Sequence, residues 1–154
     1  MLNDMFTPES LFDLLCEQGS LLDCLIESGA QQQQAIAANR MSELVAILAQ
    51  KQPALERLGE IRQQLQEKRA EIEMKEFWRE AALRPQCLAM RARAAEMFSR
   101  LIELEQVCEQ ALSASRDQIQ QRLQTVDTGR HAASAYQSQS TRLAPSRIDF
   151  SSLG

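Results

Sequence analysis

Leucine-type residues recur at steps of three and four along most of this 154-residue chain, in three successive runs. Such spacing places apolar side chains on one face of an α-helix, where neighbouring helices can bury them. Ala, Leu, Gln, Glu and Arg dominate the composition, whereas 5% of the residues are aromatic and only 5 are Gly and 4 are Pro. Because helix formers are abundant and formers of turns and strands are scarce, the sequence predicts an all-α fold.

The first run predicts a helix that begins at Thr7 and Pro8. A threonine can cap the free amides of a first turn, and proline suits that turn because it has no amide to satisfy. Leu14, Leu21 and Ile26 widen the apolar face, which favours packing inside a bundle over a two-stranded seam. The expected buried face consists of Leu11, Leu15, Gln18, Leu22, Leu25, Gly29, Gln32 and Ile36.

The second run predicts a helix for which Asn39 is a candidate cap. Pro53 lies inside this run, removes one backbone donor and disfavours the helical conformation at Gln52. Because the apolar spacing keeps its phase across Pro53, we expect a kink there and not a chain reversal. The expected buried face consists of Leu44, Leu48, Leu55, Leu58, Ile61, Leu65 and Ile72.

The third run predicts a helix from Pro85 to Asp127, after a break at Arg84 and before a closing Gly129. Long helices joined by short turns favour antiparallel neighbours. The expected fold class is therefore an elongated antiparallel three-helix bundle of coiled-coil-like helices, and the alternative is an elongated helical hairpin with an extra arm. The expected face of the third helix consists of Ala94, Phe98, Leu101, Cys108, Leu112, Ile119, Leu123 and Val126, interrupted by Glu105 and Ser115.

The apolar pattern fades after Gly129. We therefore expect a helical bundle domain at residues 1–129 and a flexible C-terminal tail at residues 130–154. The isolated apolar residues of this tail include Leu143, Ile148 and Phe150, which are too few to offset the loss of chain entropy on folding. We expect the tail to be disordered until it binds a partner.

Motifs for catalysis and for cofactors are missing from the sequence. The glycines are too scattered for a phosphate-binding loop, and the single histidine, His131, lies in the expected tail, where no rigid partner would hold it as a base. The four cysteines form no Cys-x-x-Cys pair, and we expect Cys16, Cys24, Cys87 and Cys108 to be reduced, small buried hydrophobic residues. The sequence predicts no enzyme, no metal site and no cofactor.

The charge and hydropathy of the chain limit its partners and its compartment. A net charge of −4 gives no support to a nucleic-acid partner. No apolar stretch approaches the roughly 20 residues that a membrane span needs, and the N-terminus lacks the basic start and apolar block of a signal peptide. We therefore expect a cytoplasmic protein without membrane insertion.

Three aromatic residues each leave two interpretations open. Phe77 and Trp78, near the end of the second helix, form either a core plug that closes one end of the bundle or an exposed anchor for a partner. Tyr136 is the only tyrosine, and its neighbours are Ala, Ser and Gln. It either folds back onto the helices or is presented to another protein.

The layout resembles that of the FlgN family of flagellar export chaperones over nearly the whole chain. The more specific features are the linker and helix ANRMSELVAILAQKQPALERL at residues 38–58, around Lys51, and the lone Tyr136 in a tail of small and polar residues. The third helix also matches the organisation of the family. Pro53 departs from the uninterrupted leucine pattern expected in that helix.

This resemblance implies a non-enzymatic chaperone of type III flagellar export. It would bind the C-terminal amphipathic helix of hook-associated proteins before secretion. The cargo contact would fall on Leu112, Ile119, Leu123 and Val126, and Tyr136 would dock the chaperone to the export gate. Leu143, Ile148 and Phe150 would form a flap that covers the empty groove. The alternative from the residues themselves is a structural coiled-coil module that oligomerises or scaffolds.

Overall fold

The computed structural model describes the backbone of residues 5–79 and 81–152, and the side chains of residues 5–79 and 82–138. All its regular elements are helical, which confirms the all-α fold class. Helices α1 (Pro8–Ala37), α2 (Met41–Glu67) and α3 (Arg69–Glu73) are followed by the short 3₁₀ helices η1 (Lys75–Trp78) and η2 (Ala81–Leu83) and by α4 (Arg84–Ser152). The chain divides into two units, Met1–Leu112 and Ser113–Gly154. The domain boundary expected after residue 129 stays a prediction.

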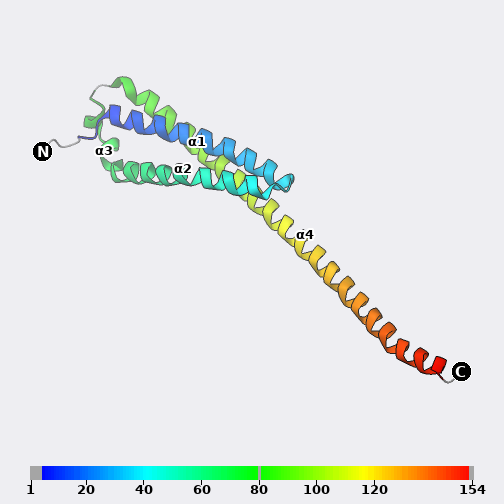
Figure 1. Ribbon diagram of the computed structural model, residues 1–154. Helices are drawn as coiled ribbons and strands as arrows, with labels where there is room; N and C mark the ends of the chain where they lie inside the picture. The colour runs from blue at the N-terminus through cyan, green and yellow to red at the C-terminus, as the bar shows by residue number, and fades with distance from the viewer. Residues whose placement is uncertain (1–4, 80, 153–154) are drawn as a thin grey trace. The chain divides into compact units, whose positions relative to one another are not determined.

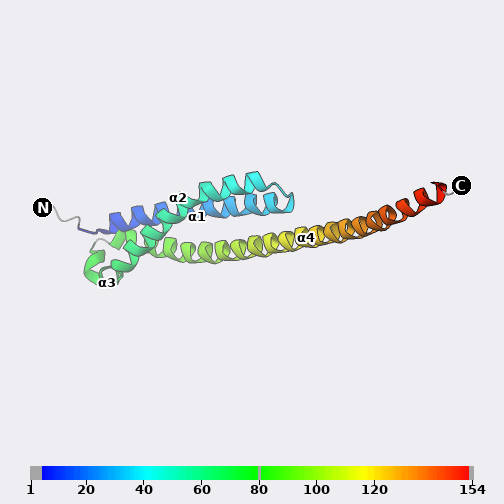
Figure 2. The same cartoon turned by 60° about the horizontal axis from the view of Figure 1, so that its bottom comes forward.

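In the first unit, α1, α2 and the first part of α4 lie side by side, as the two views in Figures 1 and 2 show. α1 and α2 form an antiparallel hairpin, and the short elements from α3 to η2 connect α2 with α4. Three apolar clusters fill the interior of this unit. The first unit is thus an antiparallel three-helix bundle, as the apolar spacing predicts.

The buried face of α1 follows steps of four and three residues without a break. All eight expected positions, from Leu11 to Ile36, are buried, and they include Gln18, Gly29 and Gln32. An alternation of three and four residues keeps one face turned toward its neighbours along a coiled-coil-like helix. Each fully buried leucine on this face contributes about 1.5–3 kcal/mol to folding.

The buried face of α2 differs from the expected one at two leucines. Leu48 and Leu55 are each 43% exposed, while Ile47 and Lys51 are buried. The reason is periodicity, because a strict alternation of three and four residues from Leu44 passes through Ile47 and Lys51. This spacing sets Leu48 and Leu55 to the side of the seam, and the sequence prediction at these two positions was wrong.

The helix ends are set by local hydrogen bonds. Thr7 caps α1 as expected, since its Oγ1 accepts a bond from the amide of Ser10 at 3.2 Å. Asn39 does not cap α2, because its φ is 56° and it closes α1 instead. The amide of Asn39 donates to the carbonyl of Ile36 at 3.1 Å, and the amide of Arg40 donates to the carbonyl of Ala35 at 2.8 Å. This pair of hydrogen bonds is typical of a helix that ends on a left-handed residue.

Two further expectations concern breaks in the helices. Pro53 lies inside α2, so the chain does not reverse there. By contrast, α4 does not end at Gly129, since its helical backbone continues to Ser152. A glycine closes a helix by adopting a positive φ, and Gly129 does not adopt one.

The aromatic pair Phe77 and Trp78, which lies in η1, plugs one end of the bundle. Trp78 is 7% exposed and packs with Leu11, Leu15 and Cys87. Its indole Nε1 donates a hydrogen bond of 2.7 Å to the carbonyl of Ile72, which satisfies the polar atom of a buried ring. Phe77 packs edge-on against Trp78, so the interpretation as a core plug is confirmed.

Candidate partner-binding surface

Helix α4 is buried on one face only as far as the first unit extends. Cys87, Ala94, Leu101 and Cys108 recur every seven residues, and all four are buried against the other helices. The last apolar contacts of this seam are those of Cys108 and Ala111 with the residues around the turn between α1 and α2. Leu112, the final residue of the first unit, is 40% exposed.

The second unit exposes apolar side chains on α4. Every side chain from residue 116 to residue 138 is exposed. Ile119, Leu123 and Val126 are 46%, 58% and 50% exposed. Steps of four and three residues place these three side chains on one face of the helix, and we call them the α4 stripe.

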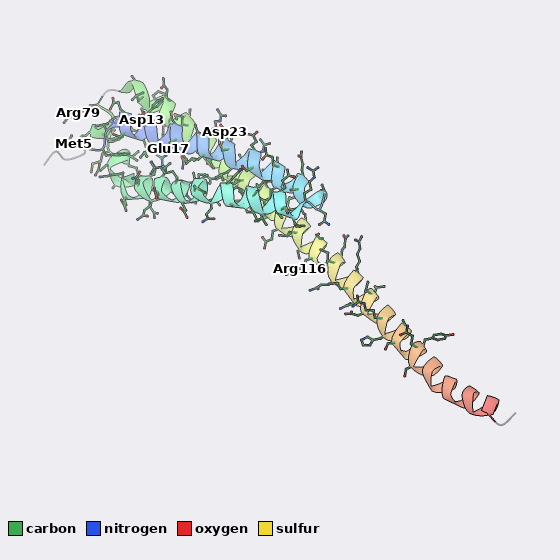
Figure 3. The ribbon with its side chains drawn as sticks, in the orientation of Figure 1. Met5, Asp13, Glu17, Asp23, Arg79 and Arg116 are labelled. Carbon is green, nitrogen blue, oxygen red and sulfur yellow. The ribbon has the colours of Figure 1, made fainter. Side chains whose placement is uncertain are left out.

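The α4 stripe is an incomplete helix seam. A helix that is isolated in water gains little stability from propensity alone, and most helices in proteins are stabilised by packing an apolar face. The stripe consists of leucine and β-branched side chains, which are typical of the buried faces between packed helices. Arg116, which Figure 3 labels on α4, and Asp117 precede the stripe, and Asp127 and Arg130 follow it, so charges of both signs flank the stripe.

Tyr136 is 75% exposed. This exposure describes the second unit by itself, and both interpretations of Tyr136 stay open. The side chains of Leu143, Ile148 and Phe150 lie outside the described ones. The flap expected from these three residues therefore has no structural description.

A buried polar layer crosses the core of the first unit, and its central residue, Lys51, is not part of the expected helix faces. Lys51 of α2 is 3% exposed, and its Nζ donates to Oε1 of Gln32 of α1 at 3.0 Å. The same Nζ forms an ion pair with Oε1 of Glu105 of α4. This layer separates the cluster around Leu22 and Leu25 from the cluster at the turn between α1 and α2. It joins all three helices through one ammonium group.

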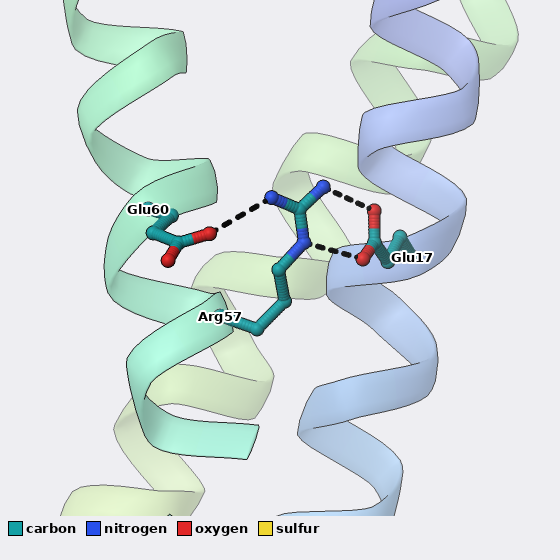
Figure 4. A network of polar contacts seen from close by, with 3 residues as sticks. All are labelled: Glu17, Arg57 and Glu60. Atoms are coloured by element: carbon teal, nitrogen blue, oxygen red, sulfur yellow. Dashed lines mark hydrogen bonds and ion pairs between the residues drawn. The ribbon is translucent and has the colours of Figure 1, made fainter. Parts of the chain in front are cut away.

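A second charged network ties α1 to α2 at the surface (Figure 4). Arg57 holds both carboxylate oxygens of Glu17, with its Nε at 2.6 Å and its Nη2 at 2.8 Å, and it donates to Glu60 at 3.1 Å. The hydrogen bond from Arg57 lowers the pKa of the Glu17 carboxyl. The carboxylate in turn raises the pKa of the Arg57 guanidinium. Figure 3 shows Glu17 on α1 with Asp13 and Asp23 along the same helix.

The cysteines are free thiols, but they do not share one environment. Cys87 and Cys108 are buried, as expected, whereas Cys16 and Cys24 are exposed on α1, so the expectation of burial was wrong for these two. They lie outside the face of α1 that the bundle buries. Burial raises the pKa values of the Cys87 and Cys108 thiols, which keeps them in the unreactive protonated form.

The described residues contain no group of three or more His, Cys, Asp and Glu side chains placed to hold a metal ion. Within the same part of the chain, no helix combines the length and the apolar character that crossing a membrane requires.

The sequence matches the model of one protein family over most of its length. The family model described as FlgN protein matches residues 1–142. The chain belongs to the FlgN family. FlgN proteins form a family of flagellar export chaperones and not a family of enzymes. Searches of curated proteins and of solved structures found no match.

The extent of the FlgN match separates the candidate residues into two groups. It includes the α4 stripe and Tyr136, which are exposed in the structure. It ends at residue 142, so Leu143, Ile148 and Phe150 lie beyond it. The residues predicted to bind cargo and to dock therefore fall within the FlgN part of the chain, and the residues predicted to form a flap fall outside it.

Proposed function

We propose that this FlgN-family protein is a cytoplasmic chaperone of type III flagellar export that binds the C-terminal helix of hook-associated proteins before their secretion. The observation that carries the proposal is the exposed α4 stripe of Ile119, Leu123 and Val126. An amphipathic helix docks by laying its apolar face against such a surface. Each half-exposed side chain of the stripe stands to contribute on the order of 1 kcal/mol when a guest helix covers it. Leu112 is proposed as a fourth contact.

The affinity of labelled peptides tests this proposal. The peptides carry the C-terminal helix of a hook-associated protein, and their binding is followed by fluorescence anisotropy. We expect I119Q/L123Q to weaken binding by about tenfold or more, since two apolar contacts are lost. The matched control is V45Q/L48Q, which changes two exposed apolar residues of α2. Equal affinities for the wild type and I119Q/L123Q would contradict the proposed cargo site.

Tyr136 is proposed as the residue that docks the loaded chaperone to the export gate. A ring that is 75% exposed can be buried by a partner without disturbing the core. We expect Y136A to keep its helicity and its cargo affinity while its secretion of hook-associated proteins falls. Unchanged secretion would count against docking, and a lower melting temperature would assign Tyr136 to internal packing.

The flap of Leu143, Ile148 and Phe150 is proposed to cover the cargo site when it is empty. A tethered segment competes at a high effective concentration. Deletion of residues 130–154 is therefore expected to raise the affinity for the cargo peptide. An affinity that falls or stays level would refute the flap.

The second candidate function is a structural coiled-coil module that oligomerises or scaffolds. The spacing of the α4 stripe favours it, because steps of three and four residues also suit pairing between two copies of α4. Light scattering over a range of protein concentrations separates the two functions. Stable self-association without affinity for hook-associated proteins would favour the module over the chaperone.

A further inference from the structure

A basic hollow lies on the first unit, between α2 and α4. Its volume is about 560 Å³, and three arginines line it from different elements. Arg62 comes from α2, Arg69 from α3 and Arg91 from α4. The other lining residues are Gly59, Gln63, Leu65 and Gln66, so no carboxylate of the described residues lines the hollow.

The arginines of this hollow are only partly neutralised. Arg69 pairs with Glu73 at 3.2 Å, and both side chains are largely exposed. The guanidinium of Arg62 lies 4.9 Å from the centre of the Phe98 ring, an arrangement that positions the cation and leaves its charge in place. In the described part of the chain, neither Arg62 nor Arg91 has a carboxylate within ion-pair distance. This concentration of positive charge stands on a chain whose net charge is −4.

The glycine of the hollow has no evident role in the fold. Gly59 lies inside α2 without a positive φ, and a Cβ placed on it would have no heavy atom within 4 Å. Glycine weakens a helix interior relative to alanine. Neither backbone conformation nor close packing therefore requires glycine at this position. What its missing side chain does provide is access to the backbone from the hollow.

We propose that this hollow binds an acidic peptide segment of a partner protein. Arg62 and Arg91 recognise its carboxylates, because the guanidinium group matches the two oxygens of a carboxylate. The Gln63 and Gln66 amides offer donors and acceptors to a peptide backbone. Gly59 is the point of closest approach. A nucleic acid would require a wider basic surface than this hollow provides on an acidic chain.

This site is separate from the α4 stripe and does not depend on the proposed chaperone function. Its lining residues all belong to the first unit, and none of them is among the residues proposed for cargo or for docking. The hollow adds a second type of recognition, by charge, to the apolar recognition proposed for the stripe.

Titration of the ¹⁵N-labelled full chain with a hexaglutamate peptide tests the site at near-physiological salt. We expect the amide signal of Gly59 to shift, and R62Q/R91Q to weaken binding by about tenfold. The control R93Q/R100Q removes the same charge from two exposed arginines of α4 outside the hollow and is expected to change the affinity less than about twofold. Equal weakening by both double variants, or a silent Gly59 signal, would overturn the proposal.

Two glycine-to-alanine variants separate an effect on peptide binding from an effect on stability. Both G59A and G19A replace a helical glycine whose added Cβ meets nothing within 4 Å. Both should raise the melting temperature, but only G59A should reduce hexaglutamate binding. An unchanged affinity in G59A would remove Gly59 from the site and contradict the proposed approach to the backbone.

Two further probes decide the class of the ligand. Inorganic phosphate should shift the Gly59 signal less than hexaglutamate does at equal charge concentration. A single-stranded oligonucleotide should bind more weakly than the peptide. A Gly59 shift as large with phosphate as with hexaglutamate would mean that the hollow is a simple anion site. Tighter binding of the oligonucleotide than of the peptide at Gly59 would mean that the ligand is a nucleic acid.

Discussion

Lys51 is the residue at which the core departs furthest from an apolar seam. A buried ammonium group is costly unless charged and polar partners satisfy it. Here Glu105 and Gln32 supply those partners from two other helices. Since these bonds link three helices at one level of the bundle, we infer that Lys51 favours this helix register.

The first prediction contrasts the two ends of this ion pair. E105A leaves the ammonium of Lys51 buried without its carboxylate, and we expect a loss of about 2–4 kcal/mol in the free energy of unfolding. K51M replaces the charged group by an apolar one of similar length and is expected to cost less than E105A, or to stabilise the bundle. Urea unfolding measures both. Equal losses in the two variants would show that the buried charge is not what makes the pair costly to break.

The second prediction concerns pH. Because the pKa of the Glu17 carboxyl is lowered by Arg57, its contribution to stability is complete above the ordinary value of 4.5 and is lost as the pH falls through the lower folded-state value. E17Q should therefore reduce the loss of stability between neutral pH and the acid side of 4.5. D13N, at an exposed carboxylate of the same helix, is the control. Identical pH profiles of urea midpoints for E17Q and the wild type would contradict this.

At the scale of elements, the turn between α1 and α2 depends on Asn39. Its φ of 56° belongs to the left-handed region, which costs most residues about 1–2 kcal/mol and costs asparagine and glycine less. We predict that N39A lowers the free energy of unfolding by about 1 kcal/mol, whereas N39G keeps or raises it. Thermal unfolding provides the comparison. A loss as large in N39G as in N39A would mean that the side chain of Asn39, and not its backbone conformation, closes α1.

The helices and most of their buried faces could be predicted from the sequence, because burial follows the spacing of leucines. The face of α1 was predicted at every step, including Gln18 and Gln32. The face of α2 was predicted less well, since two apolar spacings are present in this helix. One passes through Leu48 and Leu55, and the one that is buried passes through Lys51. A lysine at a core position of a strict repeat was the signal for the polar layer, and it needed its partners on other helices to be recognised.

Other features could not be predicted because they depend on distant or conformational information. Asn39 suits both the start of one helix and the end of another, and only its positive φ decides between them. The hollow between Arg62 and Arg91 joins residues from two helices that the linear sequence does not place together. The end of α4 was misplaced because a glycine permits a left-handed helix end without imposing one.

At the scale of the whole molecule, the burial of apolar side chains changes along α4. Within the first unit its seam is buried from Cys87 to Cys108, and in the second unit Ile119, Leu123 and Val126 are exposed. The chain belongs to the FlgN family of flagellar export chaperones. We propose that a cargo helix binds at the α4 stripe.

Hydrogen exchange of the full-length protein, with and without the C-terminal helix of a hook-associated protein, tests this claim most directly. The amides of residues 113–130 should exchange rapidly in the free protein and become protected when the guest helix binds. The amides of α1 from Leu11 to Leu25 should keep their protection in both states. Binding that protects only the first unit, and leaves the region of Ile119 and Leu123 unchanged, would contradict the account.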